Sequence, residues 1–386
     1  MRVDYRPVAV ILAGFCAFLD LYATQALLPL LAATFRASPR DVSLTVSATT
    51  VAVAIIAPFA GALADRLGRK RVITAAMFAL ILPTLLIANA DSLAAMVFWR
   101  FVQGLLLPPV FAVVVAYIGE EWPPAEATAM TGIYMAASSF GGFTSRFMTG
   151  IVAQHFGWRP AFLALAAVTL ICAIGVAALL PRERRFVRTR SVLSSARHML
   201  RHIRTPRLAA TYAVGFGVLF SFVALFTYVN FLLAAPPYRL STAALGSIFV
   251  VYLLGVAVTP ATGRLVRRFG RRRLVALLIV LWGGGLLLTL WPALAAIIAG
   301  LAVTAGCGFV CQSVATSYVA VTAEEGRSAA VGLYVTCYYV GGSLGAILPG
   351  FAWSRAGWPG CIAIVAAMLT LMAALVLRFW RDPGRG

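Results

Sequence analysis

The sequence predicts an all-α integral membrane protein, with twelve transmembrane helices arranged as two parallel six-helix repeats. Composition is the first reason: of 386 residues, 62% are hydrophobic and only 11% are charged, and a water-soluble domain could not bury so much apolar surface. The second reason is a series of apolar runs of about 20 residues, the length that spans a bilayer. The third is an internal duplication. The lipid bilayer is therefore the expected surroundings of the chain.

Twelve apolar runs can be read along the chain. They are too long for the strands of a membrane barrel and lack their alternation, so each is expected to be a helix. The runs cover residues 8–33, 42–62, 73–90, 93–118, 127–154, 160–181, 208–234, 242–263, 274–291, 293–321, 328–354 and 359–378.

The second half of the chain repeats features of the first. GALADRLGRKR (61–71) aligns with GRLVRRFGRRR (263–273) at a shift of 202. A shift of 200 then matches seven residues, which are Gly132, Tyr134, Gly141, Gly142, Gly150, Gly157 and Trp158, with their counterparts. We therefore expect an N-terminal six-helix bundle over 1–181, a basic cytoplasmic linker over 182–207 and a C-terminal bundle over 208–386.

Basic residues are distributed unevenly between the two sides of the predicted membrane. With a cytoplasmic N-terminus, the inner segments hold 25 of the 32 Lys and Arg residues and the outer loops hold five. This pattern is typical of membrane topology and explains the net charge of +20 without a nucleic-acid partner. It predicts a multi-pass protein of the cytoplasmic membrane with both termini on the cytoplasmic side.

Signatures of enzymes are missing from the sequence. It has no G-x-x-x-x-G-K-[ST] phosphate loop, no paired-carboxylate site, no His/Cys metal cluster and no nucleophile–base set. All six cysteines fall within apolar runs, where they are expected to pack as small side chains. We expect no enzyme activity, no cofactor and no metal. If the protein performs an energy-requiring process, an ion gradient would have to drive it.

Two motifs resemble a known family. GALADRLGRKR is similar to the inter-helix signature of the major facilitator superfamily, and WRFVQGLLLPP (99–109) resembles the R-x-x-Q-G motif of its twelve-span drug:proton antiporters and efflux-like members. A third antiporter signature fits only in part, because Ser145 and Arg146 stand where Gly-Pro is expected. The resemblance implies two bundles around a central cavity, alternating access, and a small-molecule substrate with protons as partners.

The first motif implies a cytoplasmic latch. Asp65 would lie at the C-terminal end of the second span, where the helix dipole disfavours a carboxylate, so it needs a partner. The resemblance supplies one at the start of the eleventh span near Ser328, and Arg69 and Arg71 are expected to pair with Glu120 and Glu121. The alternative is a loop that only sets topology. The expected latch residues are Gly61, Asp65, Arg66, Gly68, Arg69, Arg71, Glu120 and Glu121.

Asp20 is the one deeply placed acid. It lies about twelve residues, or ~18 Å, into the first run, and an ionisable group at this depth is a functional candidate with an expected partner. Arg100 and Arg146 are the two basic residues inside spans, and Asp20–Arg100 is the expected pair. We assign Asp20, Arg100 and Arg146 to proton coupling. A static buried salt bridge and a counter-ion for the substrate are the alternatives.

The second half has no deep charge, which suits an uncharged or cationic lipophilic substrate. The expected substrate-binding residues are Tyr22, Gln25, Gln103, Tyr228, Asn230, Gln312 and Tyr338. The sequence thus predicts a monomeric secondary transporter for proton-coupled export of a small organic molecule. Alternatives are an uptake symporter or uniporter of the same fold and, in another class, a membrane sensor or scaffold that transports nothing.

Overall fold

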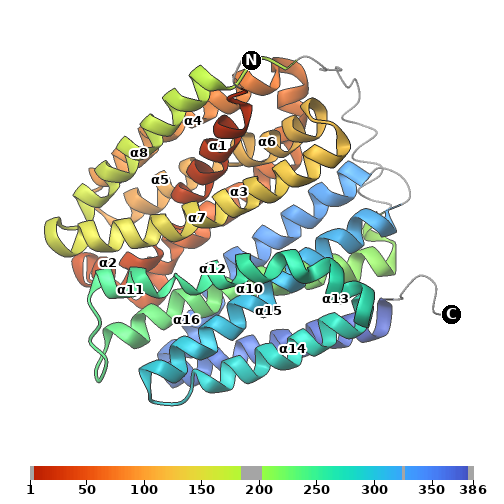
Figure 1. Ribbon diagram of the computed structural model, residues 1–386. Helices are drawn as coiled ribbons and strands as arrows, with labels where there is room; N and C mark the ends of the chain where they lie inside the picture. Colours follow the sequence, from red (N-terminus) through yellow and green to blue (C-terminus); the bar gives the residue numbers. More distant parts are fainter. Residues whose placement is uncertain (1–3, 184–201, 324–326, 381–386) are drawn as a thin grey trace. The chain divides into compact units, whose positions relative to one another are not determined.

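The computed structural model describes residues 4–183, 202–323 and 327–380. Every regular element among these residues is helical (Figure 1). The predicted basic linker falls mostly outside the described residues, since 184–201 are not among them. The same holds for the side chain of Ser328, the expected partner site of the latch.

The helices follow the predicted runs closely. In chain order they are α1 Arg6–Leu21, the short 3-10 helix η1 Gln25–Leu27, α2 Leu28–Phe35, α3 Pro39–Leu67, α4 Arg69–Ala88, α5 Leu93–Leu106, α6 Pro108–Glu121, α7 Pro124–Phe156, α8 Trp158–Leu179, α10 Pro206–Ala234, α11 Thr242–Ile248, α12 Val251–Val258, the 3-10 helix η2 Thr259–Ala261, α13 Thr262–Phe269, α14 Arg271–Leu288, α15 Leu294–Thr322 and α16 Arg327–Phe379.

Each predicted span corresponds to one helix or to consecutive helices, which confirms the predicted fold class. The first run forms α1, η1 and α2, the fourth forms α5 and α6, and the eighth runs from α11 to α13. The last two runs share α16, where Gly357 adopts a positive φ of 58° and separates them. Within the described residues, nine stretches are long and apolar enough to cross a membrane, with Ala329–Phe379 counted once.

The chain divides into two compact units. The first comprises the described residues of 1–38, 44–190 and 240–249, and the second those of 39–43, 191–239 and 250–386. In unit one, α1 packs along α7 and α8, and α4 packs along α8 and α5 (Figure 1). In unit two, α10 packs along α16, and α14 packs along α15.

Small residues allow the same close helix contact in both units. A Cβ atom added to Gly141 of α7 would collide with the main chain of Phe15 in α1. One added to Gly341 of α16 would collide with the main chain of Phe216 in α10. The two glycines are equivalent in the sequence duplication, so the two units share this close helix–helix contact. Small residues allow such close contact between helices in lipid.

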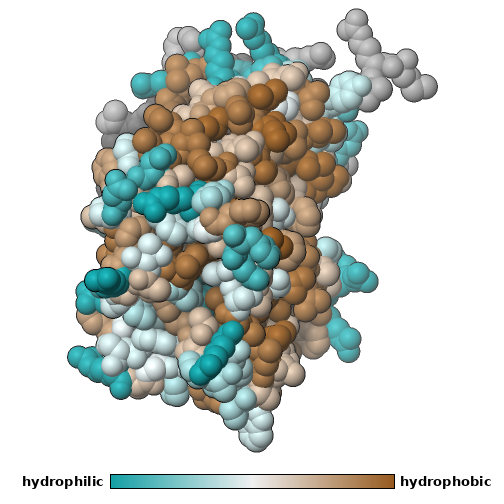
Figure 2. Space-filling view, turned by 90° about the vertical axis from the view of Figure 1, so that its left-hand side faces the viewer, coloured by the Kyte–Doolittle hydropathy of each residue, from teal (hydrophilic) through white to brown (hydrophobic). Residues whose placement is uncertain are grey.

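Large apolar side chains cover much of the outer surface. Leu82, Ile171, Val280 and Leu287 are each more than 60% exposed. Figure 2 shows broad hydrophobic areas on one side of the molecule, interrupted by single hydrophilic side chains. Apolar surface on this scale is unfavourable in water and is expected where lipid is the solvent.

Candidate functional site

The first span is broken directly after Asp20. Helix α1 ends at Leu21, and Tyr22, Ala23 and Thr24 form a turn before η1 begins. The last carbonyl groups of an α-helix have no partner inside the helix. An unsatisfied carbonyl costs several kcal/mol in hydrocarbon, so this break needs a hydrogen-bond donor.

Arg100 supplies the donor. Its Nη1 donates to the main-chain oxygen of Asp20 at 2.8 Å and its Nη2 to that of Leu21 at 2.5 Å. Its Nε donates to the main-chain oxygen of Thr45 in α3 at 3.1 Å. The side chain is fully buried, and a cation at a helix C-terminus also complements the helix dipole. Arg100 therefore caps α1 and ties it to α3.

The Asp20 carboxylate is held by neutral donors. Gln103 Nε2 donates to it at 2.7 Å, Thr169 Oγ1 at 2.9 Å and Thr84 Oγ1 at 3.3 Å. All four side chains are fully buried. Gln103 also accepts from Arg100 Nη1 through its Oε1, so it links the carboxylate to the guanidinium. We name Asp20, Thr84, Arg100, Gln103 and Thr169 the acid cluster.

The geometry of this cluster differs from the expected pair. The structure brings Asp20 and Arg100 together, yet no direct ion pair joins them among the described residues. The guanidinium of Arg100 instead donates to the carbonyl groups at the end of α1, which have no partner within the helix. The carboxylate of Asp20 accepts from Gln103. Gln103, expected at the substrate, is occupied within the cluster. Thr84 and Thr169 had been missed, because one hydroxyl in an apolar run is a weak signal.

Arg146 belongs to a second buried cluster beyond the break. Its Nε donates to Gln25 Oε1 at 2.8 Å, and its Nη1 donates to the main-chain oxygen of Gly142. The guanidinium carbon lies 4.8 Å from the ring centre of Tyr22 and 4.6 Å from that of Phe249. Tyr22 and Gln25, both expected at the substrate, thus surround Arg146 within unit one.

The four expected substrate residues of the second half lie in unit two. The Tyr228 hydroxyl donates to the main-chain oxygen of Ala346 at 2.8 Å. Asn230 Nδ2 donates to the main-chain oxygen of Phe226, in its own helix, at 2.6 Å. Both are buried, whereas Gln312 and Tyr338 are partly exposed. The two buried side chains therefore use hydrogen bonds within their own unit.

An aromatic cluster in unit two was not foreseen from the sequence. The rings of Phe226 and Tyr252 lie 4.6 Å apart, those of Phe222 and Phe309 5.3 Å, and those of Tyr252 and Phe309 5.7 Å. A Cβ atom added to Gly308 would collide with the Phe222 ring, so this glycine makes room for the cluster. The residues come from α10, α12 and α15, and no local pattern marks Tyr252 or Phe309.

Three of the expected latch residues, Asp65, Arg69 and Glu120, form an ion cluster in unit one. Arg69 Nη2 lies 2.6 Å from Asp65 Oδ1 and 2.7 Å from Glu120 Oε1, and Arg69 Nε donates to Glu120 Oε2 at 3.1 Å. Arg69 thus compensates the acid at the end of α3 and binds Glu120 of α6 with two nitrogens. Arg66 and Arg71 are exposed and form no ion pair within the described residues, so the expected pairing of Arg71 is not found.

Glu183 completes this region and had been missed. Its carboxylate accepts from the main-chain nitrogens of Arg69 at 3.1 Å and Lys70 at 3.3 Å, and so caps the N-terminus of α4. Gly68 precedes that helix with a φ of 94°, and a Cβ atom there would collide with Glu183 Oε1. Gly61, expected to allow close helix approach, has open space beside it.

The comparisons with known proteins identify the family. Residues 10–244 and 222–386 match a family model described as Major Facilitator Superfamily. The chain belongs to the major facilitator superfamily. It is 32% identical over 385 residues to the inner membrane transport protein YnfM of Escherichia coli, covering 99% of this chain and 91% of that protein. The predicted family is confirmed, and the chain is a multi-pass membrane transporter of this type.

Solved structures agree with the fold. The nucleoside transporter NupG superposes with a TM-score of 0.80 at 14% identity, covering 97% of this chain and 100% of that one. A D-xylose–proton symporter superposes with a TM-score of 0.80 at 15% identity, and 99% of each chain is covered. At this level of identity the likeness concerns the fold alone.

Proposed function

We propose that this transporter exports a small organic molecule across the cytoplasmic membrane in exchange for protons. It works by alternating access between a bundle over 1–181 and a bundle over 208–386, as a monomer with both termini in the cytoplasm. The observation that carries the proposal is the Asp20 carboxylate, which is fully buried and held by one amide and two hydroxyl groups.

These neutral partners suit a carboxylate that gains and loses a proton. A threonine hydroxyl can donate to an ionised carboxylate and, after rotation, accept from a protonated one. Thr169 and Thr84 also sit on different helices, α8 and α4, from the α1 helix that carries Asp20. Both charge states of Asp20 can therefore be satisfied without moving a helix.

Arg100 keeps its hydrogen bonds in either state. Three of its acceptors are main-chain carbonyl groups, which do not change when Asp20 is protonated. Its positive charge nearby favours the ionised carboxylate, while burial in a medium of low polarity opposes it. A proton carrier needs two opposing effects of this kind. A modest change in the access of water to Asp20 can then change whether the ionised or the protonated carboxyl is favoured.

The substrate is proposed to be uncharged, or cationic and lipophilic. Unit two presents the aromatic cluster, and aromatic faces attract cations and apolar groups. In unit one, Tyr22 and Gln25 next to Arg146 are proposed to contribute polar contacts, with Gln312 and Tyr338 in unit two. The ion cluster at Asp65 and Arg69 is proposed to stabilise the cytoplasmically closed state.

The decisive experiment measures proton movement against substrate. Everted membrane vesicles from an overexpressing strain are acidified inside, and the gradient is followed with acridine orange while lipophilic cations and uncharged compounds are added. Export by exchange predicts that a substrate dissipates the gradient in vesicles with the wild-type chain but not with Asp20→Asn. Asp91→Asn is the matched control, since Asp91 is 97% exposed.

Other outcomes would favour the alternatives. Uptake by symport predicts that substrate and protons move in the same direction, and a uniporter moves substrate without protons. A sensor or scaffold predicts no substrate movement in proteoliposomes for any compound. Gradient dissipation by Asp20→Asn equal to wild type would overturn the assignment of Asp20.

A further inference from the structure

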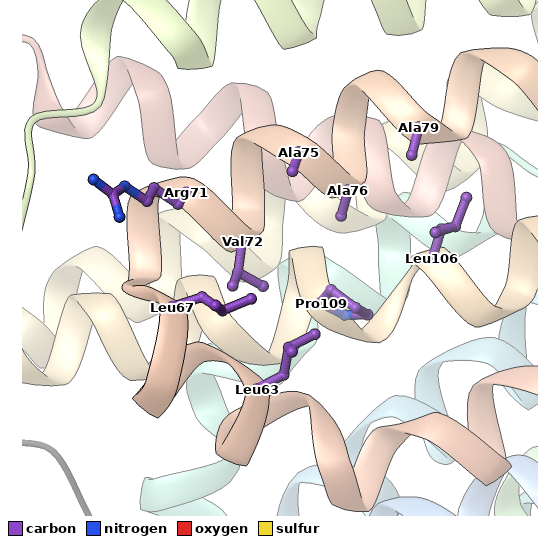
Figure 3. A pocket seen from close by; sticks show the side chains of 9 residues that line it. All are labelled: Leu63, Leu67, Arg71, Val72, Ala75, Ala76, Ala79, Leu106 and Pro109. Carbon is purple, nitrogen blue, oxygen red and sulfur yellow. The ribbon is translucent and has the colours of Figure 1, made fainter.

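A surface groove runs between α3, α4 and the junction of α5 and α6. It has a volume of about 370 Å³. Its lining is Leu63, Leu67, Arg71, Val72, Ala75, Ala76, Ala79, Leu106 and Pro109 (Figure 3). Eight of these nine side chains are apolar, and Arg71 is the exception.

The groove arises from the order of small and large residues. Ala75 and Ala76 lie on one turn of α4 and Ala79 lies on the next (Figure 3). Their short side chains line the groove beside larger neighbours. Leu63 and Leu67 form one wall, and they are 43% and 54% exposed. From Arg71 to Ala79 the helix rises about 12 Å, so the lining extends for about this length along α4. An apolar groove of this length fits an extended hydrocarbon chain better than a compact solute.

Arg71 marks one end of the groove with a positive charge. It lies in the first turn of α4, and Figure 3 shows it at the opposite end of the row from Ala79 and Leu106. Nearby Arg69 forms ion pairs with Asp65 and Glu120, whereas Arg71 forms no ion pair among the residues described. An exposed guanidinium beside an apolar channel is complementary to a phosphate attached to an acyl chain.

We propose that this groove binds one anionic phospholipid, with an acyl chain along the three alanines and the phosphate on Arg71. Arg66, at the end of α3, and Lys70, in the first turn of α4, both precede Arg71 in the chain and add positive charge for the anionic headgroup. The site is independent of the proposed transport reaction, and it adjoins the Asp65–Arg69–Glu120 ion cluster without sharing a side chain with it.

The test counts lipids bound to the purified protein. Native mass spectrometry follows titration with phosphatidylglycerol, phosphatidylcholine or glycerol 3-phosphate. Wild type should retain one phosphatidylglycerol in preference to phosphatidylcholine. Arg71→Gln should weaken that binding about fivefold, the effect of one basic residue at an anionic surface. Arg273→Gln, at the equivalent place in the second repeat, changes the net charge equally and should leave the binding unchanged.

A second variant tests the hydrocarbon part. Ala75→Phe fills the groove without a change of charge and should remove the retained lipid, while Ala167→Phe on exposed α8 surface should not. Both alanines are exposed, so the folded protein is expected to persist, and its melting temperature without added lipid checks this. Equal loss in Arg71→Gln and Arg273→Gln, or in the two phenylalanine variants, would overturn the proposal. Arg71-dependent binding of glycerol 3-phosphate as tight as that of the lipid would overturn it as well.

Discussion

Replacement of Arg100 by glutamine tests whether this residue is a helix cap or the partner of an ion pair. In the structure its guanidinium holds three main-chain carbonyl groups, at 2.5, 2.8 and 3.1 Å. A glutamine amide is shorter and has two N–H donors, so at least one of the three carbonyl groups loses its donor and the others keep at most a neutral one. A hydrogen bond to a charged group contributes about 1.5–3 kcal/mol, and a neutral one about 0.5–1.5 kcal/mol. One lost bond and two weakened bonds give an expected loss in the free energy of unfolding of about 3–6 kcal/mol.

The assay is equilibrium unfolding in mixed micelles for Arg100→Gln, Asp20→Asn and the double variant. Arg159→Gln is the control: Arg159 is 49% exposed and bonds the main-chain oxygen of Ala90 and the exposed Asp91, so it should cost less than about 1 kcal/mol. If Arg100 acted mainly as the counter-ion of Asp20, neutralising both would recover stability. A cap predicts no recovery, because the carbonyl groups stay unpaired. Recovery of the double variant to within about 1 kcal/mol of wild type would refute the capping argument.

Three further predictions concern Asp20, Gly68 and Ser221. Asp20→Asn mimics the protonated acid, so substrate exchange in proteoliposomes should persist while accumulation driven by a pH gradient falls to none; retained accumulation would place the proton elsewhere. Gly68→Ala should lower the free energy of unfolding by about 1–3 kcal/mol, because alanine is strained at a φ of 94° and its Cβ atom would collide with Glu183. Gly61→Ala is the control in thermal unfolding. Gly61 has open space beside it, so this change should be neutral or stabilising. Ser221→Ala should cost less than about 1 kcal/mol, because the buried Ser221 hydroxyl has no hydrogen-bond partner among the described residues; a larger loss would reveal a partner.

Hydropathy was sufficient to predict the helices, because in a membrane each span must satisfy its own backbone. The same reasoning singled out Asp20, since a buried acid stands out in an apolar run. It could not foresee what Arg100 binds. That depends on carbonyl groups freed by the turn at Tyr22–Thr24, and only Pro29, in the first turn of α2, hints at a break. The hydrogen bonds of Thr84 and Thr169 to Asp20 depend on which faces of α4 and α8 pack against α1. Helix packing of this kind belongs to the tertiary structure and is not visible in a single apolar run.

Comparison of the two copies explains why the acid cluster is confined to the first. Gly141 against Phe15 and Gly341 against Phe216 keep the helix packing alike in both units, so the duplication preserved the scaffold. By the register of those contacts, Ser221 stands where Asp20 would be. A lone serine at that depth needs no counter-charge and no set of donors. Units with common packing can therefore differ in chemistry. This asymmetry supports the proposal that the proton step belongs to unit one, whereas the aromatic cluster lies in unit two.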